Sequence, residues 1–339
     1  MMRKNWLLLL GITIVFIQCK KENDGKTEAG FEEVITYMPG KLQINAIVID
    51  PSGDKWIGTD SGLFRSDNAK WLSFTALKNV RINSLQTKEN NIFIGAESGA
   101  YTLQPESGII DSFTRNQPGV SFNSVTIFNI GFGERKWFGN PAGLSMFDGN
   151  IFLQNKYISL SLVSITRVNS MAFRHNDAFF GTNGLFLYRI KYNPETDAIT
   201  GASQLLGGAD NPYLNYNGEL TTDTIFCVMA SADSSIWFGS LKGLTRNKGE
   251  TKVDNGDFEY FLRDEKVRCV YEFSMDEIWA GTEDGIFVRK QNVWEHYSVE
   301  NGISGNTIFC MAKDFDGSIW IGTEKGLTVF KNGEFRSSG

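Results

Sequence analysis

Asn306-Thr-Ile-Phe-Cys-Met-Ala-Lys-Asp-Phe-Asp-Gly-Ser-Ile-Trp-Ile-Gly-Thr-Glu-Lys-Gly-Leu327 is the stretch that decides the fold. It contains a short apolar strand, an Asp-Gly turn, a second apolar strand and a turn enclosed by two glycines. This Gly-x-x-x-Gly pattern recurs along the chain, and the fourth copy is one residue shorter. The copies begin at Gly58, Gly95, Gly139, Gly181, Gly239, Gly281 and Gly322. Intervals of about 40 residues are typical of four-stranded propeller blades.

The residues beside the glycines repeat as well. Two positions before each first glycine stand Trp56, Phe93, Trp137, Phe179, Trp237, Trp279 and Trp320. Apolar residues on both faces of this strand suit a sheet packed between two neighbouring sheets, and sheets arranged radially leave only short edges. The repeat therefore predicts an all-β fold, a seven-bladed β-propeller of four-stranded antiparallel blades over residues 31–339. We expect the aromatic positions to form the core between blades.

Two segments compete for the strand that closes the ring. Residues 31–37 read as an outer strand without a blade of its own, and pairing with the last blade would remove an open edge. Residues 334–336 follow Lys331-Asn-Gly333 as a hairpin return would. The first arrangement joins the two ends of the chain, and it is the one we predict.

The first thirty residues differ from the repeats. Arg3 and Lys4 precede a twelve-residue apolar stretch that ends before Cys19, too short to span a bilayer but suited to a signal peptide. The segment resembles a bacterial lipoprotein signal, which implies a signal peptide over residues 1–18, lipidation of Cys19 and a flexible tether over residues 19–30. A membrane anchor with an incidental cysteine is the alternative. The resemblance implies a lipid-anchored protein at the outer membrane of a Gram-negative bacterium, on its periplasmic side or at the cell surface.

Composition and motifs offer little catalytic chemistry. The formal net charge is −6 and no basic cluster occurs, which argues against nucleic acid as a partner. The two histidines, His175 and His296, fall in a hairpin turn and an outer strand, where we expect exposure to solvent. Asp314-Phe-Asp-Gly317 lacks the later acidic ligands of a calcium loop and is interpreted as a hairpin turn. We expect no catalytic residue, no metal, no cofactor and a monomeric protein bound to membranes only through its lipid.

Three cysteines follow the repeat. Cys227, Cys269 and Cys310 each lie twelve residues before the first glycine of their blade, where blade 1 has Ala46. A metal site or redox pair near the axis is one interpretation, but the spacing matches no metal motif. We favour the interpretation that the three cysteines are small side chains packed where the blades converge.

The repeat is interrupted between the fourth and fifth copies. The interval is longer because of an extended outer hairpin over residues 188–204 and a connection over residues 207–218. That connection is expected on the side of the glycine turns and offers rings beside amides and a carboxylate, which suit sugars. The candidate ligand-binding residues are Asp210, Asn211, Tyr213, Asn215, Tyr216 and Asn217. An exposed loop of turn residues is the alternative.

The glycine turns add a mixed rim on the same side. Its members are Asp60, Glu97, Asn140, Asn183, Lys242, Glu283, Asp284, Glu324 and Lys325. A glycosidase would need two of these carboxylates about 5–10 Å apart, and spacing along the chain does not bring any two together. An enzyme, a lyase or a glycosidase, therefore stays a second alternative.

The phrases 306–327 and Asp50-Pro-Ser-Gly-Asp-Lys-Trp-Ile-Gly-Thr-Asp-Ser-Gly-Leu63 resemble the two-component regulator propeller repeat. The resemblance implies a periplasmic sensor propeller, often one that recognises oligosaccharides. The chain ends directly after its seventh blade, so we expect no kinase activity of its own. The predicted function is a non-catalytic extracytoplasmic ligand-binding lipoprotein whose partner is an oligosaccharide or another small ligand. A scaffold that docks a membrane or periplasmic protein is the first alternative.

Overall fold

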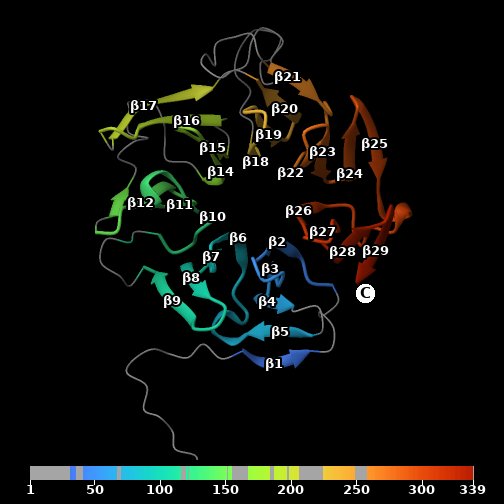
Figure 1. Ribbon diagram of the computed structural model, residues 1–339, viewed down its shortest axis with the longest axis horizontal. Coiled ribbons are helices and arrows are strands. Elements are labelled where there is room, and N and C mark those ends of the chain that lie inside the picture. The colour runs from blue at the N-terminus through green and yellow to red at the C-terminus, as the bar shows by residue number, and fades with distance from the viewer. Residues whose placement is uncertain are drawn as a thin grey trace, which may run out of the picture.

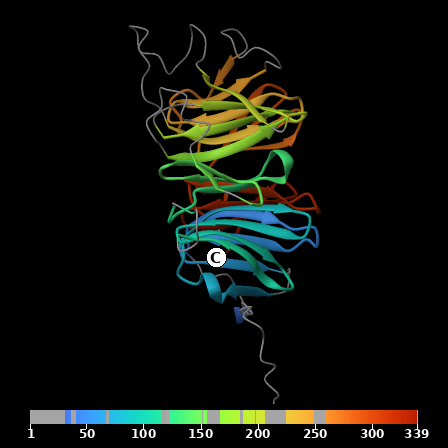
Figure 2. The ribbon, with the colours of Figure 1, turned by 90° about the vertical axis from the view of Figure 1, so that its left-hand side faces the viewer.

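Seven β-sheets stand radially around one axis in the computed structural model, as predicted (Figure 1). The structure describes residues 31–35, 41–66, 70–115, 120, 122–150, 152–154, 167–183, 187–196, 198–205, 224–248 and 258–338. Six sheets have four antiparallel strands, and the sheet of blade 1 has five. Seen from the side, the ring is a flat disc (Figure 2).

Each blade runs from its inner strand to its outer strand in chain order. Blades 1 to 3 comprise β2 (Ile44–Ile49), β3 (Lys55–Thr59), β4 (Leu63–Ser66) and β5 (Trp71–Phe74); β6 (Ile82–Lys88), β7 (Asn91–Ala96), β8 (Gly99–Gln104) and β9 (Gly108–Phe113); β10 (Ile127–Ile130), β11 (Lys136–Asn140), β12 (Gly143–Phe147) and β13 (Phe152–Gln154). Blades 4 and 5 comprise β14 (Val168–Arg174), β15 (Asp177–Thr182), β16 (Leu187–Asn193) and β17 (Ala198–Leu205); β18 (Ile225–Ala230), β19 (Ile236–Ser240), β20 (Gly243–Asn247) and β21 (Phe258–Phe261). Blades 6 and 7 comprise β22 (Cys269–Ser274), β23 (Glu277–Thr282), β24 (Gly285–Lys290) and β25 (Val293–Tyr297); β26 (Ile308–Lys313), β27 (Ile319–Thr323), β28 (Gly326–Lys331) and β29 (Glu334–Ser338).

Helical structure in the described residues is limited to short 3-10 turns. They are η1 (Thr75–Leu77), η2 (Phe132–Glu134) and η3 (Val299–Asn301). No helix among the described residues is long and apolar enough to cross a bilayer.

The two ends of the blades define two faces of the disc. The turns between second and third strands, which carry the glycines, open on one side, here called the glycine face. Because antiparallel strands alternate in direction, the turns between first and second strands and between third and fourth strands open on the opposite side, here called the hairpin face. The connections between blades that the structure describes in full, residues 75–81, 262–268 and 298–307, lie on the glycine face.

The two glycines of each repeat have different roles. The second glycine has a positive φ, a conformation that side chains with a Cβ adopt at a cost. This holds for Gly62, Gly99, Gly143, Gly243, Gly285 and Gly326. The tight turn between second and third strands therefore explains only the second glycine of the motif.

The first glycine makes room for the next blade. A methyl group on Gly58 would lie 2.6 Å from Cγ2 of Ile82, which begins the inner strand of blade 2. The corresponding β-branched residues of the other blades are Val125, Val168, Ile225, Val267, Ile308 and Ile44. Each would meet the added methyl of the preceding blade's first glycine. One Gly–Ile or Gly–Val contact thus joins every pair of neighbouring blades.

A Gly–Ile contact also joins blade 7 to blade 1. Our prediction that residues 31–37 supply the outer strand of blade 7 is wrong. Residues 31–35 form β1, which pairs with β5 as the fifth strand of blade 1. Blade 7 has its own outer strand, β29, paired with β28. Asn332 and Gly333 both have positive φ, the geometry of a two-residue hairpin turn. The local hairpin therefore supplies the fourth strand of blade 7, as the rival interpretation has it.

Side chains rather than strands hold blade 7 to blade 1. Ile44 packs against Gly322, and a methyl there would lie 2.6 Å from Cγ2 of Ile44. The ammonium of Lys55 lies 2.8 Å from the carboxylate of Asp314, and both side chains are about nine-tenths buried or more. The rings of Trp71 and Trp320 meet edge to face, with centroids 6.4 Å apart. The closing interface is thus an apolar contact with one buried ion pair.

The aromatic positions before the first glycines form the core, as predicted. The indoles of Trp56, Trp137, Trp237 and Trp279 are fully buried, and so is Phe179. Phe93 is buried too, and Trp320 is half-buried at the closing interface. These residues belong to clusters that each combine side chains of neighbouring blades, so packing between blades, rather than ligand stacking, accounts for them.

Candidate functional site

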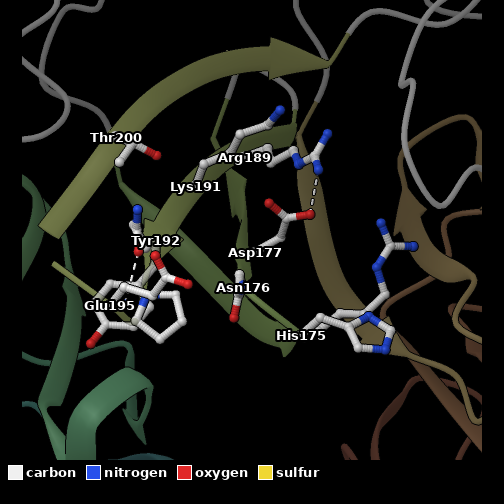
Figure 3. Close-up of a pocket in the computed structure, with 11 residues that line it drawn as sticks. His175, Asn176, Asp177, Arg189, Lys191, Tyr192, Glu195 and Thr200 are labelled. Atoms are coloured by element: carbon white, nitrogen blue, oxygen red, sulfur yellow. Dashed lines mark hydrogen bonds and ion pairs between the residues drawn. The ribbon is translucent and has the colours of Figure 1, made fainter. Parts of the chain in front are cut away.

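A pocket of about 650 Å³ opens on the hairpin face of blade 4 (Figure 3). Its lining comes from the β14–β15 turn and from the β16–β17 hairpin. The lining residues are Arg174, His175, Asn176, Asp177, Arg189, Lys191, Tyr192, Asn193, Pro194, Glu195 and Thr200. The volume lies within the range of about 300–1,000 Å³ that small-molecule sites occupy.

The extended outer hairpin of the sequence builds one wall of this pocket. The hairpin turns directly after Asn193, at the position expected from the sequence. A β-bulge between Lys191 and Tyr192 interrupts the pairing of β16 with β17, and bulges re-aim side chains. The amide of Tyr192 donates a 2.8 Å hydrogen bond to the carbonyl of Asn176, which ties the hairpin to the first turn.

A buried ion pair forms part of the pocket lining. Arg189 donates through Nη2 to the carboxylate of Asp177, and both side chains are close to nine-tenths buried or more. The guanidinium carbons of Arg189 and Arg174 lie 6.0 Å and 5.0 Å from the centroid of Phe179. Both guanidinium groups thus pack against the buried ring of Phe179. This cation–π contact helps to hold them in place without a second carboxylate.

Neighbouring blades hold the pocket in place from both sides. The ring of Tyr192 stacks on Phe132 of blade 3 with centroids 4.8 Å apart and an interplanar angle of 1°. On the other side, Arg174 donates to the carbonyl of Ser234 in the first turn of blade 5. The walls are therefore part of the blade packing and are formed before a ligand arrives.

The lining is polar and slightly cationic. Three cationic side chains (Arg174, Arg189 and Lys191) face two carboxylates (Asp177 and Glu195), with amides and a hydroxyl beside them. Lys191 and Glu195 are exposed and stand at the opening. Such a site can donate and accept many hydrogen bonds, which suits a hydrophilic ligand.

A second, smaller pocket of about 300 Å³ lies between blades 1 and 2, also on the hairpin face. Its Asp50 carboxylate already accepts hydrogen bonds from Ser52 and from Trp56 Nε1. Burial raises the pKa of Asp50, but these hydrogen bonds outweigh it, so the pKa lies below its ordinary value. This carboxylate belongs to the turn and is less suited to ligands than the blade 4 pocket.

The predicted ligand loop lies outside the described residues. All six candidates, Asp210, Asn211, Tyr213, Asn215, Tyr216 and Asn217, fall in residues 206–223, and Cys19 falls in residues 1–30. The blade 4 pocket was missed at the sequence level, although the long hairpin that forms its wall was noted. The pocket also lies on the hairpin face, opposite the side on which we expected a ligand.

In the predicted mixed rim, the carboxylate of Glu283 is held by two cationic side chains. Glu283 accepts hydrogen bonds from Lys266 Nζ at 2.9 Å and from Arg268 Nε at 3.1 Å. Burial raises the pKa of Glu283, but its two cationic partners outweigh it and hold the pKa below its ordinary value. A general acid needs a raised pKa, so Glu283 is a charge partner rather than a proton donor.

Both histidines are exposed, as predicted. His175 stands in the β14–β15 turn with a φ of 51°, and His296 stands in β25 with Nε2 2.5 Å from the carbonyl of Asp284. His175 belongs to the blade 4 pocket, a role that the sequence did not suggest. Asp314 to Gly317 form a hairpin turn closed by a 3.0 Å bond from the Gly317 amide to the Asp314 carbonyl.

The three cysteines pair directly with the first glycines of their blades. Cys227, Cys269 and Cys310 stand opposite Gly239, Gly281 and Gly322. The thiols of Cys269 and Cys310 each lie 3.8 Å from a carbonyl oxygen of the next blade. Among the described residues, no cluster of three His, Cys, Asp or Glu side chains could hold a metal ion. The geometry supports the packing interpretation.

These thiols are expected to react slowly. Burial raises the pKa of Cys227 to about 12 and raises the pKa of Cys269 and Cys310 as well. Because the thiolate is the reactive form, we expect at least a hundredfold slower modification by a disulfide reagent at pH 8 in the native protein than in denaturant. Cys269→Ser should leave the fold intact, since Ser84 and Ser170 occupy the same position in blades 2 and 4. Rapid native modification of all three thiols would contradict the burial.

Residues 302–325 match the two component regulator propeller family. The chain therefore carries this repeat in its seventh blade, where the stretch 306–327 resembles it. No curated protein shows significant sequence similarity to the chain.

Solved structures share the fold. The extracellular domain of the BT4673 regulatory system from B. thetaiotaomicron superposes with a TM-score of 0.67 and 17% identity, covering 89% of this chain and 40% of that one. PorZ, a surface component of the type-IX secretion system of Porphyromonas gingivalis, gives a TM-score of 0.63 and 15% identity, covering 91% and 47%. Virginiamycin B lyase from Staphylococcus aureus gives a TM-score of 0.64 and 13% identity, covering 88% and 97%. At these identities the likeness establishes the fold, and this chain spans less than half of the first two proteins.

Proposed function

We propose that this chain is a non-catalytic ligand-binding propeller that works outside the cytoplasm. The observation that carries the proposal is the blade 4 pocket, whose polar walls are fixed by contacts with blades 3 and 5. Preformed sites lose little free energy to ordering when they bind. The regulator repeat and the fold shared with an extracellular regulator domain support a sensory or recognition role.

The ligand class that suits this pocket is a hydroxyl-rich molecule such as an oligosaccharide. Sugar hydroxyls both donate and accept hydrogen bonds. The pocket presents the amides of Asn176 and Asn193, the hydroxyl of Thr200 and the ammonium of Lys191 for such contacts. The small cationic excess favours a ligand that is neutral or carries a negative group.

A thermal-shift screen of oligosaccharides tests the proposal. A ligand present at a hundredfold excess over its Kd stabilises the native protein by about 2.7 kcal/mol. We expect the stabilisation to disappear in an Asn176→Ala, Lys191→Ala double variant, since each lost hydrogen bond weakens binding by about tenfold. An Asn90→Ala, Gln104→Ala double variant of the smaller pocket is the matched control. Stabilisation that survives in the first variant, or chemical conversion of the ligand, would contradict the proposal.

A lipid anchor at Cys19 would hold the propeller at a membrane. The support is the sequence alone, a signal-like segment over residues 1–18 followed by Cys19 and a polar tether. We expect the full chain to fractionate with membranes and Cys19→Ser to move it to the soluble fraction. Cys310→Ser is the matched control, because that thiol is packed between blades. Continued membrane retention of the Cys19 variant would exclude lipidation as the anchor.

A further inference from the structure

Two cationic side chains of the blade 4 pocket stand on one face of β16. Arg189 and Lys191 are two residues apart, and residues at this spacing in a strand point to the same face. In the pairing of β15 with β16, Arg189 stands opposite Phe179 and Lys191 stands opposite Asp177. All four side chains therefore share one face of the blade, and Arg189, Lys191 and Asp177 line the pocket (Figure 3).

The carboxylate that stands opposite Lys191 is already used by Arg189. Arg189 reaches diagonally across the two strands to Asp177 and forms the buried ion pair with it. Lys191 is exposed at the opening of the pocket. Within the part of the chain that the structure describes, its ammonium has no ion pair and no hydrogen bond. The ammonium of Lys191 is therefore available to a ligand.

The lining of the pocket carries one positive charge in excess. With His175 counted as neutral, Arg174, Arg189 and Lys191 stand against the carboxylates of Asp177 and Glu195. Figure 3 shows Glu195 near the turn of the hairpin, apart from the ammonium of Lys191. One singly charged anionic group beside Lys191 would balance the pocket, whereas a doubly charged phosphate would leave an excess of negative charge.

Open space adjoins Lys191 on the side of β17. Gly201 stands opposite Lys191, and a methyl group added to Gly201 would have no atom within 4 Å. The pairing passes from Gly201 directly to Ile199, so Thr200 is the extra residue of the bulge. Thr200 is exposed and lines the pocket. An anionic group beside Lys191 thus has room and a neighbouring hydroxyl that can donate to it.

We propose that the blade 4 pocket selects a sugar acid and that Lys191 binds the carboxylate of this ligand. The inference rests on the ligand-binding function proposed above and names the class of ligand. Lys191 donates a charge-assisted hydrogen bond to the carboxylate, and Thr200 donates a second bond. The amides of Asn176 and Asn193 serve the sugar hydroxyls, and Glu195 accepts from hydroxyls near the turn of the hairpin.

Titration of the full chain with matched sugars tests the inference. The probes are short oligogalacturonides and oligoglucuronides, each paired with its carboxyl-reduced form, which keeps the sugar skeleton and carries no charge. We expect at least one acidic probe to raise the Tm of the wild-type protein and to bind about tenfold more tightly than its reduced form, the effect of one hydrogen bond to a charged group. Lys191→Gln should remove most of this preference and change the binding of the reduced form far less.

A matched variant separates this contact from a general effect of charge. Lys290→Gln removes the same charge from an exposed position at the end of β24, on the hairpin face of blade 6, and it should keep the preference of the wild type. Equal loss in both variants, or a reduced sugar that binds as tightly as its acidic form, would overturn the inference and leave the ligand-binding function in place. Absence of binding by every acidic probe would overturn it as well, and the wider oligosaccharide screen then tests the function of the pocket by itself.

Discussion

Gly322→Ala is expected to lower the free energy of unfolding by about 3 kcal/mol, the upper part of the range for adding a methyl group to a filled core. The new methyl would lie 2.6 Å from Cγ2 of Ile44, on the inner strand of blade 1. Because no strand is shared between blades 7 and 1, this contact is a main part of ring closure. Chemical denaturation followed by tryptophan fluorescence measures the change.

Two further variants show whether crowding at the closing interface is the cause. Gly201→Ala adds a methyl where no atom lies within 4 Å, so its stability should stay within about 0.5 kcal/mol of the wild type. The new methyl meets Cys310 Sγ of its own blade and the side chain of Ile44. Ile44→Ala removes the contact across the interface, so the Gly322→Ala, Ile44→Ala variant should lose less stability than the sum of the single losses. Additive losses, or a Gly322 variant as stable as the wild type, would contradict closure by this contact.

Asp177→Ala is expected to cost about 3–5 kcal/mol, because it leaves the buried charge of Arg189 without its partner. Arg189 Nε already lacks a hydrogen-bond partner among the described residues, so the guanidinium has little to compensate the loss. The same variant should abolish ligand binding in the blade 4 pocket, since Asp177 and Arg189 are part of its lining. Thermal denaturation and the ligand screen report the two effects separately.

A double variant separates the buried charge from a general packing defect. Asp177→Ala combined with Arg189→Met removes both charges and should recover most of the lost stability, as apolar replacements of buried pairs do elsewhere. The exposed pair Arg336–Glu334 is the control, and Glu334→Ala should be indistinguishable from the wild type. An Asp177→Ala variant that loses less than about 1 kcal/mol would mean that the pair behaves as a surface ion pair.

The number of blades could be predicted because every blade carries the same sequence motif. An aromatic residue, two glycines and a following apolar residue recur at every second and third strand, and these positions are fixed by contacts within one blade or with the next. The motif alone did not show that its two glycines are needed for different reasons. Gly326 is required by its φ of 126°, whereas Gly322 is required by the approach of Cys310 in its own blade and of Ile44 in the next. Only the assembled ring shows the contact with Ile44.

Ring closure could not be decided from the sequence, since both ends of the chain read as outer strands. Asn332 and Gly333 favour a local hairpin with β29, and a short loop costs less conformational entropy than joining the two ends. The hairpin therefore fills the position that we assigned to residues 31–37. That segment adds to blade 1 instead.

The candidate site was harder to predict because some of its walls depend on contacts between blades, which the sequence does not show. The long hairpin was visible in the sequence, but the contact of Tyr192 with Phe132 of blade 3 and the bond from Arg174 to Ser234 of blade 5 depend on how blades pack.

Amide hydrogen exchange of the full chain, with and without the ligand found in the screen, shows whether the ligand binds in the blade 4 pocket. Exchange slows where a ligand covers or rigidifies hydrogen-bonded backbone. We expect slower exchange in residues 174–177 and 189–200, the two segments that contain the lining of the blade 4 pocket on the hairpin face. Slower exchange confined to the glycine face, with no change in these two segments, would contradict it.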